Sequence, residues 1–372
     1  MTEIGTRRSD ERTGGEFGAW LAFAGCLIAV FMQMIDVTIV NTALPNLTAD
    51  LRASQSAQVL VVSGYSLAFA CTLLTAARIG AIFGRRAVFL VSVTAFTAAS
   101  VWCGMSTSAA ELVIARIAQG VAGAGMAAQT IAILIASFPP NRHQQVFALY
   151  GATAGFAGML GPILGGALVT ADIGGLGWHS IFLMNLPIGV LAFVLGFKYL
   201  HLGTPLERDR LDLVGVALST VSLFALLAAL ADIQQNGWRP WPFGAIAAAF
   251  ALGAVFFVYE RGLVRRGGSP LVRLDLFADR GFAIGAALVA SFFGLFTAFV
   301  FTVSITLQDE LHWSALRTGM AMTPFALGAG TGALASMLLE SVGGYGHSHS
   351  ALRCTDAVWQ SARHICGSPQ AR

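Results

Sequence analysis

The sequence predicts an all-α polytopic membrane protein, with about ten transmembrane helices and a cytoplasmic N-terminus. Three observations support this fold class. Of the 372 residues, 56% are hydrophobic and only 11% are charged, and the mean hydropathy is +0.72, whereas soluble domains carry about 25% charged residues. Apolar runs recur near the length of about 20 residues that crosses the hydrocarbon core as a helix. Finally, the basic residues are distributed unevenly among the connectors between these runs.

The apolar runs define the expected helices. They lie at residues 17–40, 58–80, 87–105, 111–137, 145–170, 179–199, 212–232, 241–260, 281–306 and 318–340. The first run follows a polar stretch and contains an aspartate, Asp36, so we interpret it as a lasting first helix and not as a cleaved signal peptide.

Basic residues concentrate in alternate connectors. The richer set holds Arg7, Arg8, Arg12, Arg78, Arg85, Arg86, Arg142, Lys198, Arg208, Arg210, Arg261, Arg265, Arg266, Arg273 and Arg280. The other set holds Arg52, Arg239 and Arg317. Because cytoplasmic loops are enriched in Lys and Arg, this alternation places the N-terminus in the cytoplasm. A single missed helix would break the alternation, so its regularity also supports ten spans.

The connectors and runs divide the chain into segments of different character. We expect a cytoplasmic tail at 1–16, a six-helix bundle at 17–199, a cytoplasmic linker at 200–211, two linking helices at 212–260, a cytoplasmic loop at 261–280, two further helices at 281–340 and an atypical tail at 341–372. The tail mixes His, Cys, Ser and Arg without apolar periodicity, and its spacing fits no structural zinc pattern. We interpret it as a disordered or frameshifted end that binds no metal.

The first run carries the most unusual charge. In "MIDVTIVNTALP", Met34 to Pro45, the carboxylate of Asp36 lies late in an apolar helix, where a charge costs about 2.5–3.5 kcal/mol on insertion scales. Such a group is tolerated facing a cavity or a partner, and there it can take up and release protons as a proton-coupled carrier requires. The alternative is an interfacial aspartate that ends the helix near Asn41 and Pro45.

The fourth run combines charge with small residues. Arg116, Gln119, Gly120 and Gly123 are spaced three and four residues apart, which places them along one helical face. A polar, closely packing face is expected to look into the bundle, since arginine in lipid is costly. The alternative is a structural hydrogen bond from Arg116 to a carbonyl, without a role in transport.

The fifth run is rich in glycine and contains a proline: Gly158, Gly161, Pro162, Gly165 and Gly166. Small residues at this spacing let helices approach closely, and proline frees a backbone carbonyl and permits a bend. Close packing alone would also explain the glycines, so the compact GPxxGG core from Gly161 to Gly166 is the specific part of the pattern.

The connector between the second and third runs, "AARIGAIFGRR", gathers positive charge without an acidic residue. Its residues of interest are Arg78, Gly80, Ala81, Gly84, Arg85 and Arg86. We interpret its three arginines as anchors on the cytoplasmic side.

The sequence carries no set of residues typical of an enzyme. It contains no phosphate-binding "GxxxxGK[ST]" motif, no Ser-His-Asp set, no paired metal ligands and no basic, aromatic surface for nucleic acid. We therefore expect no enzymatic activity, cofactor, metal, ATP or nucleic acid. An ion gradient or another subunit would have to supply the energy for any work.

Taken together and in this order, these segments resemble the major facilitator superfamily, and more narrowly its 14-helix drug:proton antiporter family. "DVTIVNTALP", with Thr38, Asn41 and Pro45, resembles the first-helix signature. "RIAQG" resembles the fourth-helix arginine motif, and "GPILGG" is similar to the core of the fifth-helix antiporter motif. The resemblance runs from about residue 17 to residue 340.

The resemblance implies proton-coupled export of drugs, or of other small hydrophobic or cationic compounds, across the bacterial cytoplasmic membrane. It implies that Asp36 carries the proton, that Arg116 is its partner in the cavity, and that Gly161–Gly166 form a bend that favours exchange. Gln119, on the same helical face as Arg116, is assigned to the same proton-coupling set. The family has an aspartate where this chain has Ala81, in a loop whose ion pairs clamp the outward-facing state. We therefore expect weakened conformational gating.

The family pattern of six, two and six helices also differs from the six, two and two found here. Residues 281–340 would then form the first two helices of an incomplete C-terminal bundle. Two alternatives to a drug exporter stay open: a truncated, transport-inactive membrane protein (a fragment or pseudogene product), and a small-solute:proton symporter, which the GPxxGG core disfavours.

Overall fold

The computed structural model describes residues 3–200 and 211–307, except 238, 267, 269 and 273, together with the isolated positions 311, 313, 317, 321, 324 and 328. In these residues all regular structure is helical. The α-helices are α1 (Glu3–Asp50), α2 (Gln55–Phe83), α3 (Arg85–Met105), α4 (Ala109–Ser137), α5 (His143–Ala171), α6 (Ser180–Leu183), α7 (Asn185–Tyr199), α8 (Leu213–Asn236), α9 (Pro240–Arg265) and α10 (Arg280–Ile305). The expected all-α fold class is confirmed.

Among the described residues, eight helical segments are long and apolar enough to cross a membrane. They coincide with the first eight expected spans, the sixth combining a short 3-10 turn at Gly177–His179 with α6 and α7. The ninth expected span, 281–306, coincides with α10. The tenth, 318–340, falls outside the described residues apart from isolated positions, and the tail at 341–372 lies entirely outside them.

The first helix is longer than the apolar run predicts. It begins at Glu3 and continues through Pro45 to Asp50. Asp36 therefore lies well inside a continuous helix, and the alternative in which it ends the helix near Asn41 and Pro45 is wrong. A proline removes one backbone hydrogen bond of a helix, and here that loss does not terminate it.

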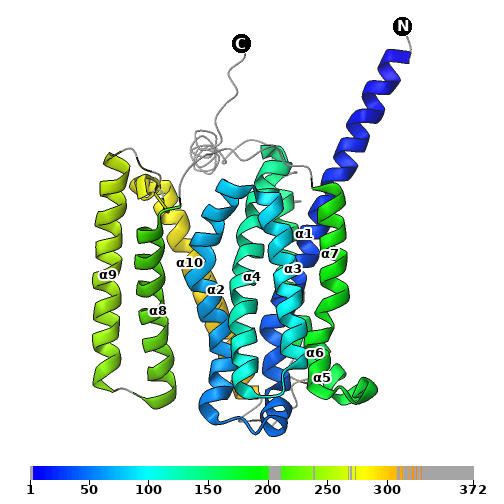
Figure 1. Ribbon diagram of the computed structural model, residues 1–372. Helices are drawn as coiled ribbons and strands as arrows, with labels where there is room; N and C mark the ends of the chain where they lie inside the picture. Colours follow the sequence, from blue (N-terminus) through cyan, green and yellow to red (C-terminus); the bar gives the residue numbers. More distant parts are fainter. Residues whose placement is uncertain are drawn as a thin grey trace.

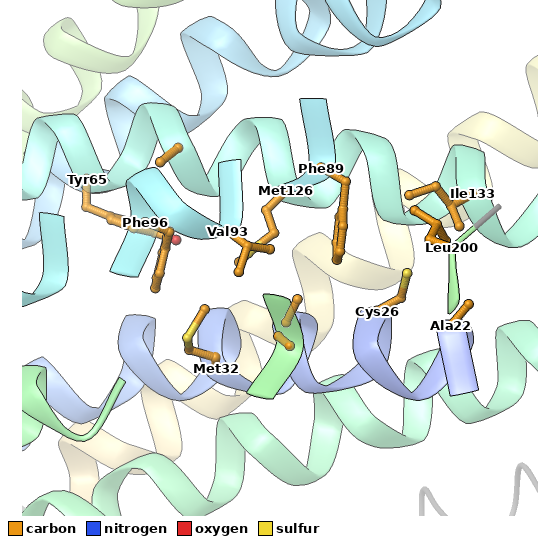
Figure 2. Packing of buried hydrophobic residues seen from close by; sticks show 13 residues of the cluster. Ala22, Cys26, Met32, Tyr65, Phe89, Val93, Phe96, Met126, Ile133 and Leu200 are labelled. Atoms are coloured by element: carbon orange, nitrogen blue, oxygen red, sulfur yellow. The ribbon is translucent and has the colours of Figure 1, made fainter. Parts of the chain in front are cut away.

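Helices α1 to α7 form one bundle, named here the N-terminal bundle, whose core lies between α1, α3 and α4. Figure 2 shows Met32 of α1 opposite Val93 and Phe96 of α3, with Met126 of α4 beside Val93 and with Phe89 further along α3. All five side chains are fully buried. Lipid tails are as apolar as these side chains, so in a bilayer their contribution comes from close packing.

Helices α8 and α9 form a hairpin beside this bundle (Figure 1). Helix α8 packs against α2, and α9 packs against the far side of α8. Helix α10 follows and exposes large apolar side chains along its length, including Ile284, Leu288, Phe292 and Leu295, which are 60–73% exposed in the structure. Such a surface is stable only against lipid or another apolar surface.

Candidate functional site

The structure joins the two charges that the sequence places inside membrane helices. Arg116 Nη1 of α4 lies 2.5 Å from Asp36 Oδ2 of α1, and the two side chains are 2% and 0% exposed. Because an isolated charge at this depth is costly, each residue neutralises the other.

The remaining oxygen of Asp36 is held by two amides. Its Oδ1 accepts hydrogen bonds from Gln119 Nε2 at 2.8 Å and from Asn185 Nδ2 at 3.1 Å. Both amides also donate to Ser100 Oγ, at 3.2 and 2.8 Å, and Ser100 in turn donates to the carbonyl of Phe182 at 3.0 Å. All four polar side chains are fully buried, so they form one polar network enclosed by α1, α3, α4 and α7.

Arg116 has further partners that fix its orientation. Its Nε donates to the carbonyl of Val61 at 3.2 Å, and its Nη1 also donates to Gln119 Oε1 at 2.7 Å. The guanidinium lies 4.4 Å from the centre of the Tyr65 ring, a cation–π geometry. The carbonyl contact expected of a purely structural arginine is therefore present, together with the ion pair to Asp36.

Sequence reasoning found three of the five network residues and missed Asn185 and Ser100. Asn185 could have been found from the sequence, because it is the single amide in the apolar stretch "SIFLMNLPIGVLAFVLGF". Ser100 could not, since a serine hydroxyl in a membrane helix can bond to the carbonyl one turn back and so needs no other partner. Of the first-helix signature, Asn41 and Pro45 are exposed and lie outside the network.

Glycines on α4 allow the helices to approach closely enough for these contacts. A Cβ at Gly120 would collide with the backbone carbonyl of Tyr65 on α2, and one at Gly123 would lie 2.9 Å from the Tyr65 hydroxyl. The glycine side of α4 therefore brings α2 within reach of Arg116, as the shared face of these residues predicts.

The GPxxGG segment packs α5 against α1. A Cβ at Gly161 would collide with Thr38 Oγ1, and one at Gly165 would lie 2.8 Å from Ile39 Cγ1. Gly166 is only at ordinary contact distance from α1, and a Cβ at Gly158 would meet no atom within 4 Å. Pro162 lies inside α5, which continues to Ala171. The segment thus contacts α1 at Thr38, Ile39 and Thr42, two to six residues after Asp36.

We expect Gly161→Ala to destabilise the protein by about 1–3 kcal/mol, since an added methyl forces a closely packed contact apart. The matched control is Gly158→Ala on the same helix, which adds the same methyl in open space and should be neutral or slightly stabilising. Thermal unfolding of the purified chain in detergent measures both. Equal melting temperatures for the two variants would contradict the assigned α1–α5 contact.

The connector between α2 and α3 consists of one residue, Gly84, whose φ of +95° favours glycine. Arg85 Nη1 donates to the carbonyl of Ala132 at 2.9 Å, and Arg86 Nη2 donates to the carbonyl of Phe197 at 2.7 Å. These carbonyls lie near the C-terminal ends of α4 and α7, where cations are favoured. Two of the three clustered arginines therefore bind backbone carbonyls.

The other positions of this connector belong to the end of α2. Gly80 is buried, and a Cβ there would collide with the side chain of Gln129, whose Nε2 donates to the carbonyl of Ala76 at 2.7 Å. Ala81 is partly buried. Arg78 lies one turn before Ala81, on the part of α2 that approaches α8.

Comparison with known proteins adds a family and several relatives. Residues 26–346 match the Major Facilitator Superfamily. The chain is 36% identical over 315 residues to the probable actinorhodin transporter of Streptomyces coelicolor, covering 85% of this chain and 54% of that protein. It is 32% identical over 301 residues to multidrug resistance protein Stp of Mycobacterium tuberculosis (80% and 55%). It is 31% identical over 310 residues to the tetracenomycin C resistance and export protein of Streptomyces glaucescens (82% and 56%). The chain thus spans just over half the length of these relatives.

Proposed function

Since the chain belongs to the Major Facilitator Superfamily, a family of membrane transporters, we propose that it serves in proton-coupled export of drugs or other small hydrophobic or cationic compounds. The membership makes it a multi-pass protein of the cell membrane. The proposal adds three points to this membership: that transport is export, that it is coupled to protons, and that the substrates are drugs or similar small compounds. The names of the three relatives refer to transport, export or drug resistance, which favours export as the direction.

The observation that carries the proposal is the buried Asp36–Arg116 pair inside the N-terminal bundle. A structural contact between α1 and α4 could be made by apolar packing, which costs nothing in desolvation. Ionisable residues buried within a membrane bundle characteristically mark ion or substrate pathways. The pair is enclosed in this structure, so another conformation must give protons access to it.

Proton uptake by Asp36 would disturb every contact it makes here. Both oxygens accept hydrogen bonds from N–H donors of Arg116, Gln119 and Asn185, and a protonated carboxyl presents an O–H donor in place of one acceptor. At least one N–H would lose its partner, and the Arg116 charge would lose its counter-ion. Protonation therefore favours separation of α1 from α4 and α7.

The network also contains an acceptor that a new donor can use. Asn185 Oδ1 is buried and has no hydrogen-bond partner among the described residues. A side chain in this state costs free energy, and an O–H on Asp36 or a polar group of a substrate can satisfy it. A cationic compound and a proton would then compete for the same carboxylate, which is the basis of exchange.

Transport in inverted membrane vesicles tests the proposal. With an acid interior, vesicles containing this chain should accumulate the cationic dye ethidium, and adding the dye should release protons from the interior. Asp36→Asn should abolish the gradient-dependent accumulation if the carboxylate is the coupling group, because asparagine carries no exchangeable charge. Glu111→Gln is the control, because Glu111 is partly exposed, contacts Trp102 and Thr107, and lies outside the network.

The outcomes separate the alternatives. Dye and protons moving in the same direction would indicate a symporter. No gradient-dependent flux from a chain that is folded and inserted would support the transport-inactive alternative and would overturn the proposal. Full activity of Asp36→Asn would show that another group carries the proton.

A further inference from the structure

Two carboxylates meet at the end of the α8–α9 hairpin where α8 begins. Asp212 directly precedes α8, and its Oδ1 accepts a hydrogen bond from Tyr259 Oη of α9 at 2.9 Å. Glu260, the next residue of α9, is fully buried. A Cβ at Gly215 would lie 2.8 Å from Glu260 Oε1 and would collide with Asp212 Oδ2. The two carboxylates therefore converge over Gly215.

Neutral groups satisfy this pair only in part. Glu260 Oε1 accepts a hydrogen bond from the backbone N–H of Leu271 at 3.1 Å. Glu260 Oε2 and Asp212 Oδ2 are buried and have no hydrogen-bond partner among the described residues. Both carboxylates reach the same point, the Cβ position of Gly215, so as like charges they repel each other, and burial strengthens the repulsion. The pair thus needs a cation.

The register between α2 and α8 places Arg78 at the height of Asp212, at the start of α8. The two helices run in opposite directions (Figure 1), and they touch where Thr220 Oγ1 donates to the carbonyl of Cys71 at 3.3 Å. Arg78 lies seven residues after Cys71, two turns along the same face of α2. Seven residues before Thr220 lies Leu213, the neighbour of Asp212. Arg78 also interacts electrostatically with Glu260.

We propose that Arg78 is the counter-ion of Asp212 and Glu260, and that this charge cluster fastens the α8–α9 hairpin to α2 of the N-terminal bundle. The hairpin then moves with that bundle. The cluster also supplies negative charge beside the connector in which Ala81 replaces the expected acid. The proposal concerns helix packing alone and is independent of transport.

Cys71 provides a reporter for this attachment, because it is 6% exposed and its Sγ lies 3.7 Å from the carbonyl of Thr220 on α8. In a full-length chain that keeps Cys71 as its single cysteine, the rate of labelling by a membrane-permeant maleimide follows the separation of α2 from α8. We expect Arg78→Gln and Glu260→Gln each to raise this rate by about 3- to 10-fold, as for a partly buried ion pair. The glutamine at position 260 keeps the acceptor for Leu271.

The double variant decides between coupled and independent effects. If the two charges pair, Arg78→Gln combined with Glu260→Gln should label no faster than the faster single variant. The charge-reversed pair Arg78→Glu and Glu260→Arg should return the rate toward that of the original chain. Arg86→Gln is the control, since Arg86 binds α7, and it should leave the rate unchanged.

Two results would overturn the proposal. One is a labelling rate in the double variant that rises by the product of the two single increases, and the other is an unchanged rate in both single variants. Where a single variant fails to fold, the charge-reversed chain still tests it. Recovery of folding and of slow labelling supports the pairing, and failure of both contradicts it.

Discussion

Asp36→Asn should lower the free energy of unfolding by about 3–5 kcal/mol, because removing one partner of a buried ion pair leaves the other charge uncompensated. Arg116 would remain enclosed by Tyr65, the Val61 carbonyl and Gln119, all neutral. Asparagine has nearly the shape of aspartate, so the loss reports charge and not volume. The melting temperature of the purified chain in lipid nanodiscs measures the effect.

A double-mutant cycle separates this pairing from general damage. Arg116→Gln alone should cost a similar amount, since it leaves the Asp36 carboxylate unpaired. The combination of Asp36→Asn and Arg116→Gln removes both charges and should cost clearly less than the sum of the two single changes. Additive losses would show that the two residues stabilise the bundle independently, despite their contact.

Gly120→Ala should destabilise the chain by about 1–3 kcal/mol or more, because the added methyl would collide with backbone and backbone relaxes less readily than a side-chain end. The collision is with the Tyr65 carbonyl of α2, one turn from the Arg116 contact with Val61. Separation of α2 from α4 would therefore also weaken the hold on Arg116.

The matched control for this change is Gly155→Ala on α5, where a methyl would meet no atom within 4 Å. It should raise stability slightly, since alanine favours a helix over glycine by up to about 1 kcal/mol. Both are measured by thermal unfolding in detergent. A Gly120→Ala chain as stable as the control would contradict the close approach of α2 and α4.

The positions of the helices could be predicted because the bilayer leaves so few options. A spanning segment must satisfy its backbone hydrogen bonds internally, and in the part of the chain that the structure describes the first nine expected runs are helices. Asp36 and Arg116 could be selected for the same kind of reason, since charges inside such runs need a partner. Helical periodicity also placed Gly120 on the same side of α4 as Arg116.

Periodicity does not identify which neighbouring helix a given helical face will contact, and for this reason some site residues were misjudged or missed. Gly158 belongs to the same glycine-rich series as Gly161, yet a Cβ added there would meet no atom within 4 Å. Ser100 was missed because a single hydroxyl does not stand out in an apolar run. Glu260 was missed because it lies at the end of its run, where a charge is expected to face water, and its burial depends on Gly215 of another helix.

The two arginine–carbonyl contacts at the α2–α3 connector have a consequence for how the bundle can respond to acid. Neither a guanidinium nor a carbonyl oxygen gains or loses a proton at physiological pH. The ties from Arg85 to α4 and from Arg86 to α7 therefore hold with the same strength whether the medium is acidic or neutral. Under the proposed coupling, by contrast, one proton on Asp36 would rearrange its network of hydrogen bonds. The bundle would then combine proton-insensitive contacts at the α2–α3 connector with a proton-responsive network between α1, α3, α4 and α7.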